Sequence, residues 1–76
     1  MSTRLITESD SLQTTKSLIA SNFFRFANNP SNADITSLLF LVAALVMLNS
    51  DTSTQTQNVA RRLANAGISR SRQTKK

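Results

Sequence analysis

Six positively charged side chains gather in residues 59–76, a stretch that contains no acidic residue. Residues 1–58 carry three cations and four acids, so the positive charge is concentrated in this one segment. Guanidinium and ammonium groups neutralise the phosphates of nucleic acids, and an anionic membrane face would attract the same charges. The candidate nucleic-acid-binding residues are Arg61, Arg62, Arg70, Arg72, Lys75 and Lys76.

The pattern of these cations predicts binding that does not depend on base sequence. No recognition-helix signature accompanies them, and the segment contains no aromatic residue that could stack on a base. Arg61 and Arg62 are adjacent, which separates them by about 100° around a helix. We therefore expect that these two side chains do not both face one groove.

Other kinds of chemistry find few suitable residues. The chain has no His, no Cys and no Tyr, and its four acids, Glu8, Asp10, Asp34 and Asp51, are scattered without metal-ligand spacing. Nucleophilic and general acid–base catalysis draw mainly on these residue types. A single Gly does not make a phosphate-cradling loop. We expect no enzymatic activity, no metal, no cofactor and no small-molecule substrate.

The stretch Leu38–Leu48 is eleven consecutive apolar residues, and Ile35 extends it backward across Thr36 and Ser37. On a helix this run is apolar on every side, so it must be covered on every side. We expect that one neighbouring helix covers one stripe and that the other faces meet further copies of the chain.

The pattern predicts an all-α fold: an antiparallel helix–turn–helix hairpin, a single domain, that packs into a multi-subunit helical assembly. We predict a helix over about residues 11–28, a turn at 29–32, a long helix over about 33–66 and a flexible basic tail at 68–76. The polar stretch 49–58 is compatible either with a loop or with a helix that its neighbours stabilise, and we favour the continuous helix. The turn contains Pro30, which disfavours helix at the residue before it. Gly67 is well placed to end the long helix.

The expected subunit interface consists of the apolar face of the first helix together with the apolar run. Its members are Leu12, Ile19, Phe23, Phe26, Ile35, Leu38, Leu39, Phe40, Leu41, Val42, Leu45, Val46 and Leu48.

The apolar run has a second interpretation, a single membrane span with a cytoplasmic basic C-terminus. A span needs about 20 apolar residues, whereas Ile35–Leu48 supplies 14. The Ser/Thr-rich stretch 50–56 would be a place for an O-linked glycan if it faces outward.

The chain resembles the major coat proteins of rod-shaped, bacilliform archaeal viruses of the clavavirus type, known from Aeropyrum. The resemblance rests on the chain length, the Asn28–Asn32 turn and the apolar Ile35–Leu48 segment. It implies a capsid protein of the virion, present in many copies as a helical shell of hairpins around double-stranded DNA.

Overall fold

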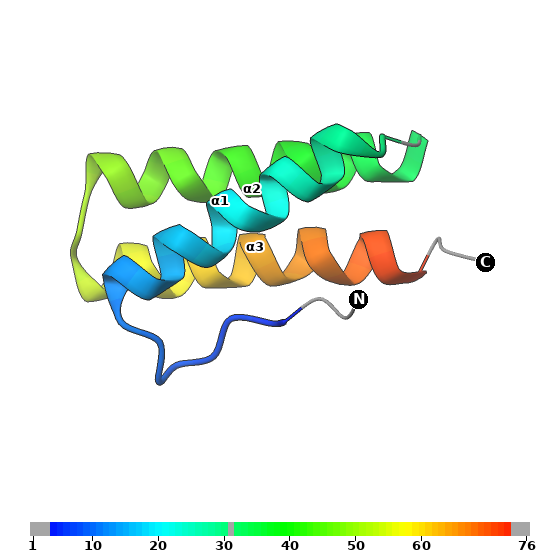
Figure 1. Cartoon of the computed structure of the whole chain (residues 1–76). Coiled ribbons are helices and arrows are strands. Elements are labelled where there is room, and N and C mark those ends of the chain that lie inside the picture. The colour runs from blue at the N-terminus through cyan, green and yellow to red at the C-terminus, as the bar shows by residue number, and fades with distance from the viewer. Residues whose placement is uncertain (1–3, 31, 74–76) are drawn as a thin grey trace.

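Three α-helices make up the structure, a computed structural model that describes residues 4–30 and 32–73 (Figure 1). They are α1 (Leu12–Asn28), α2 (Asn32–Ser50) and α3 (Thr54–Gln73). The all-α prediction is confirmed. The helix predicted over about 11–28 matches α1 closely, and residue 31 of the predicted turn lies outside the described residues.

Helix α1 begins at a conventional cap and buries one stripe. The Ser11 hydroxyl oxygen accepts a hydrogen bond from the Thr14 N–H at 3.2 Å, which satisfies a backbone donor of the first turn. The buried positions are Thr15, Ile19, Asn22 and Phe26, whose spacing of four, three and four places them on one face.

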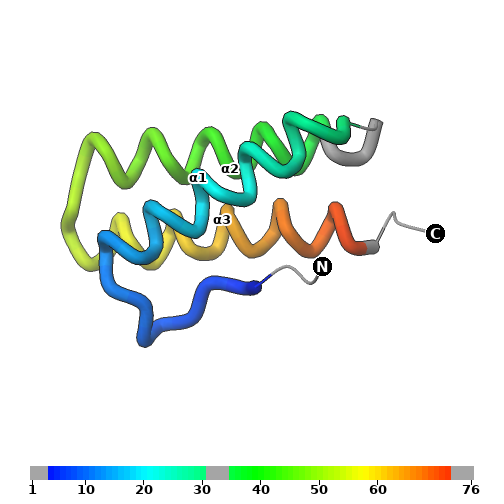
Figure 2. The backbone as a smooth tube through the Cα atoms, viewed as in Figure 1, coloured from blue at the N-terminus to red at the C-terminus, as the bar shows by residue number. Residues whose placement is uncertain are grey.

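The prediction of one long helix over about 33–66 is wrong. The chain breaks at residues 51–53 and returns along itself, so that α2 and α3 run antiparallel (Figure 2). Asp51 stabilises the break, because its carboxylate accepts the Ser53 N–H at 2.9 Å and the Thr56 hydroxyl at 2.7 Å. The Ser53 hydroxyl in turn accepts the Thr56 N–H at 3.2 Å and caps α3. The polar residues at 51–53 therefore end α2 and begin α3.

The expected tail also differs from the structure. Helix α3 continues through Gln73, and Ile68 is fully buried instead of belonging to a flexible end. Gly67 lies inside this helix and does not end it. Residues 74–76 lie outside the described residues.

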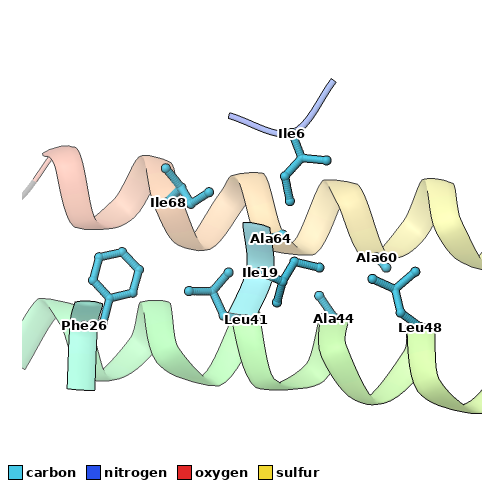
Figure 3. Close-up of a cluster of buried hydrophobic side chains, with 9 residues drawn as sticks. All are labelled: Ile6, Ile19, Phe26, Leu41, Ala44, Leu48, Ala60, Ala64 and Ile68. Atoms are coloured by element: carbon cyan, nitrogen blue, oxygen red, sulfur yellow. The ribbon is translucent and has the colours of Figure 1, made fainter. Parts of the chain in front are cut away.

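Helix α2 is the centre of the bundle and packs along both α1 and α3, whereas α1 and α3 touch each other little. Its inner face meets a row of mostly small residues on α3, and Ile6 reaches the core from the N-terminal segment (Figure 3). The expectation that this chain covers only one stripe of the apolar helix is therefore wrong, because the break at 51–53 creates a third helix. The core residues are Ile6, Ile19, Phe26, Leu41, Ala44, Leu48, Ala60, Ala64 and Ile68.

Helix α3 lies very close to α2 at Gly67. A β-carbon built there would lie 2.8 Å from the Ser37 carbonyl oxygen and 3.1 Å from the Phe40 β-carbon. The first distance is shorter than a van der Waals contact, and the atom that it meets belongs to the backbone. The absence of a side chain at residue 67 therefore allows the two helices to pack this closely.

Gly67→Ala should lower the free energy of unfolding by roughly 1–3 kcal/mol, the usual cost of forcing extra atoms into a packed interior. The gain of about 1 kcal/mol that Ala normally brings to a helix interior will offset part of this loss. Urea denaturation followed by circular dichroism measures the change. Gln55→Ala, at an exposed position of α3, is the control and should not destabilise. An unchanged or raised stability of the Gly67 variant would show that α3 does not sit this close to α2.

Asp51 should make the stability of the protein depend on pH. Hydrogen bonds from the Thr56 hydroxyl and from Ser53 to the carboxylate lower the pKa of Asp51 below its ordinary 3.8. The pKa of Asp51 is lower in the folded protein than in the unfolded chain. The ionised carboxylate therefore contributes its full stabilisation above pH 3.8, and this stabilisation is lost as the pH falls through the folded pKa. The wild type should therefore exceed Asp51→Asn in thermal stability at neutral pH, and the difference should shrink in strong acid. Thr56→Ala should reduce the same pH dependence. If the difference in thermal stability between the wild type and Asp51→Asn were the same at every pH, this account would be refuted.

Candidate functional site

The outer face of α3 is polar and cationic. Its residues recur at spacings of three, four and seven, the spacing of one helix face, and that face lies opposite the core positions Ala60 and Ala64. Arg61 and Arg72 are separated by about 16 Å along the helix at 1.5 Å per residue. The face consists of Asn58, Arg61, Arg62, Asn65, Ser69 and Arg72.

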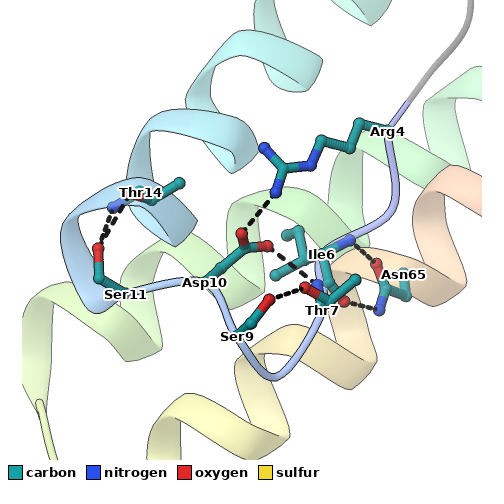
Figure 4. Close-up of polar contacts among 8 residues, drawn as sticks. All are labelled: Arg4, Ile6, Thr7, Ser9, Asp10, Ser11, Thr14 and Asn65. Atoms are coloured by element: carbon teal, nitrogen blue, oxygen red, sulfur yellow. Dashed lines mark hydrogen bonds and ion pairs between the residues drawn. The ribbon is translucent and has the colours of Figure 1, made fainter.

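The N-terminal segment lies beside this face because Asn65 holds it there (Figure 4). The Ile6 N–H donates to Asn65 Oδ1 at 2.8 Å, and Asn65 Nδ2 donates to the Ile6 carbonyl oxygen at 2.8 Å. One side-chain amide thus satisfies both backbone groups of a residue 59 positions away. The Ile6 side chain is buried in the core at the same place.

Asp10 fixes the shape of the same segment. Its carboxylate accepts a hydrogen bond from Arg4 Nη2 at 2.7 Å and one from the Thr7 N–H at 2.9 Å. The Asp10 N–H donates to the Thr7 carbonyl oxygen at 3.1 Å and closes a turn. This turn carries Glu8 at an exposed position.

The segment and the helix enclose a shallow recess of about 250 Å³. Arg61 and Arg62 both line it, although they are about 100° apart around the helix. Whether both side chains face one groove of a bound nucleic acid stays a prediction. Arg61 is also oriented by its neighbour, since its guanidinium donates to Asn58 Oδ1. The lining residues are Ile6, Glu8, Asn58, Arg61, Arg62 and Asn65.

The structure does not bring all six predicted cations together. Arg70 lies on the flank of α3 next to α2, where its guanidinium carbon is 5.2 Å from the centre of the Phe40 ring, a cation–π contact. Arg72 is exposed on the outer face. Lys75 and Lys76 lie outside the described residues.

A second candidate surface is an apolar stripe on α2. Ile35, Leu39, Val42 and Val46 recur at spacings of four, three and four, and all four are exposed, Leu39 with 66% of its surface. They lie on the side of the helix opposite the buried Leu41 and Leu48. These four residues are called the apolar stripe below.

The apolar stripe is the part of the predicted subunit interface that the fold leaves open. Four other residues of that prediction are buried inside the chain itself and are not available to a neighbour in this fold: Ile19, Phe26, Leu41 and Leu48. The remaining five are half-buried: Leu12, Leu38 and Leu45 pack against the core, and Phe23 and Phe40 are partly covered. The third helix, α3, adds to this burial, and the local sequence pattern does not predict it.

In the part of the chain that the structure describes, no helix has both the length and the apolar character needed to cross a membrane. No group of three or more acidic, His or Cys side chains comes together among residues 4–30 and 32–73 in a way that could hold a metal ion.

Sequence reasoning missed the roles of Ile6, Glu8 and Asn65. A lone Asn within a helix is a weak signal, because most such residues face solvent. The one available hint was that Asn58, Arg61, Arg62 and Asn65 share helical spacing. A spacing of 59 residues between hydrogen-bonded partners gives no local pattern at all.

In comparisons with protein-family models, curated proteins and solved structures, nothing matched this chain.

Asn65→Ala should release the N-terminal segment from α3. The substitution leaves two partly buried backbone groups without partners, which costs roughly 1–3 kcal/mol for each group that stays buried. We expect a lower stability and a loss of protection of the Ile6 amide in hydrogen exchange. Gln55→Ala is the control on the same helix. Full protection of the Ile6 amide in the Asn65 variant would show that the segment is held by other contacts.

Proposed function

We propose that this protein is a structural coat subunit, which assembles into a helical virion shell and binds the enclosed nucleic acid without regard to base sequence. In this proposal the subunits join through the apolar stripe, and the cationic outer face of α3 neutralises phosphates. The many copies of the chain are its main partners, and nucleic acid is the other. The exposed Ser/Thr stretch at 50–55 remains a place where a glycan could be attached.

The observation that carries the proposal is the apolar stripe. Contiguous apolar patches on a folded surface are typical of contacts with other proteins. Full burial of one large apolar side chain contributes roughly 1.5–3 kcal/mol to the free energy of association. A side chain that is already partly covered in the subunit contributes less. A stripe of four such residues is therefore a modest contact for a pair of molecules. It becomes a strong one when every subunit of a long assembly repeats it.

The positions of the two surfaces support their use in one assembly. The apolar stripe lies on the side of α2 away from the core, and the cationic face lies on the side of α3 away from the core. A subunit could therefore contact its neighbour and a polyanion at the same time. Double-stranded DNA is the nucleic acid that the resemblance to clavavirus coat proteins implies.

Leu39→Asp tests the assembly without disturbing the core, since Leu39 is exposed whereas Leu41 is fully buried. A charge placed in a contact that excludes water should raise the dissociation constant for self-association by about 100-fold or more. Sedimentation velocity over a range of concentrations, together with electron microscopy, measures this change. Circular dichroism should show an unchanged helix content.

Phe24→Asp is the matched control, because Phe24 is 64% exposed but lies on α1, outside the apolar stripe. It should leave self-association unaltered. A wild type that remains a monomer at high concentration would overturn the coat proposal. Equal losses in the two variants would overturn the assignment of the contact to the stripe.

A further inference from the structure

We propose that the recess between the N-terminal segment and α3 is a phosphate-binding site, with Arg61 and Arg62 as the groups that hold the phosphate. The inference rests on the proposed function in one respect: there, the phosphate belongs to the backbone of the nucleic acid. A free phosphate ion presents the same oxygen atoms and is the other source of this group.

The residues of the recess suit an oxyanion. The two guanidinium groups carry planar arrays of N–H donors that match the oxygen atoms of a phosphate. Asn58 accepts from Arg61 through Oδ1, which orients that guanidinium and leaves the Asn58 amide N–H₂ as a further donor. Asn65 uses both its oxygen and its nitrogen on the Ile6 backbone, so it forms a wall of the recess and is not a ligand.

The size of the recess favours a small anion. Pockets that bind drug-sized molecules and cofactors usually have about 300–1,000 Å³ and mostly apolar walls. This recess has about 250 Å³, and four of its six lining residues are Asn or Arg. The mostly polar lining, more than the volume, suits a phosphate group better than an apolar organic ligand.

Glu8 places a negative charge in the recess that opposes the binding of a phosphate by the two arginines. Glu8 lines the same recess as Arg61 and Arg62, so its negative charge repels an incoming phosphate. The segment that carries Glu8 is held to α3 through Ile6, which keeps this negative charge near the site. The formal charge of the lining is thus two cations against one acid, enough to attract a phosphate but weaker than the arginines alone would be.

Comparing Arg62→Gln with Arg70→Gln distinguishes phosphate binding in the recess from a general attraction between the nucleic acid and the positive charge of α3. Each removes one positive charge from α3, but Arg62 lines the recess, whereas Arg70 lies on the opposite flank over Phe40. Fluorescence anisotropy with a labelled short duplex oligonucleotide, over a range of salt concentrations, gives the affinity and its salt dependence. Arg62→Gln should weaken binding roughly tenfold and lower the salt slope by about one, the value for one lost phosphate contact. Arg70→Gln should have a clearly smaller effect.

Glu8→Gln tests the recess in the opposite direction, because it removes the negative charge that repels a phosphate. It should strengthen binding several-fold, and more than Gln13→Lys, which raises the net charge by the same amount at an exposed position of α1 outside the recess. Circular dichroism on every variant confirms that the fold is retained. An Arg62→Gln variant that retains wild-type affinity, or a Glu8→Gln variant no stronger than Gln13→Lys, would overturn the site.

A titration with inorganic phosphate, followed by the NMR signals of the arginine Nε–H groups, distinguishes the two sources of the phosphate. Shifts of Arg61 and Arg62 with phosphate, together with tight oligonucleotide binding, support the site and the proposed role in binding nucleic acid. Shifts with phosphate but no oligonucleotide binding support the site and overturn the nucleic-acid part of the proposed function. Oligonucleotide binding that Arg62→Gln and Arg70→Gln weaken equally supports the proposed function and overturns the site.

Discussion

The close contact between α2 and α3 is the constraint on which the rest of the structure depends. Leu41 and Leu48 on α2 pack in one core with Ala60, Ala64 and Gly67 on α3, so large side chains of one helix face small ones of the other. Small residues on α3 let the backbones approach, and the larger side chains of α2 then fill the space between them. This contact buries the inner face of the apolar helix, which α1 alone could not cover. Without it, the chain would have the exposed helix that its sequence suggests.

The apolar character of α2 is divided between two roles by this contact. The side that carries Leu41 and Leu48 stabilises the subunit, and the side that carries Leu39 and Val46 is left at the surface. A helix with equally apolar inner and outer faces gains nothing within one subunit from its outer side chains. In the proposed assembly a neighbouring subunit would cover these side chains, and because no charged residue lies between Ile35 and Ser50, covering them would not require desolvating a charge.

Polar side chains place the cationic groups. Asp51 and Ser53 turn the chain back, and this turn is what directs residues 54–73 along α2 and sets which side of α3 faces outward. Asn65 then holds the N-terminal segment against that outward side and makes one wall of the recess. A few hydrogen bonds of short polar residues therefore decide where the charges of two arginines act. Their own contribution to the energy of folding is modest.

The sequence by itself determined the helical class, the first helix, the excess of apolar surface and the cationic segment, because each is a local property of residue type and helical spacing. The tertiary structure decided the break at residues 51–53, since a run of Ser, Thr, Asn and Asp is compatible with a loop, a cap or a helix held by its neighbours. It also decided which face of α2 is buried, because a helix that is apolar all round shows no preferred side in its sequence. The pairing of Ile6 with Asn65 was out of reach for the same reason: contacts between distant residues depend on how the helices pack, and packing is settled only when the whole chain is folded.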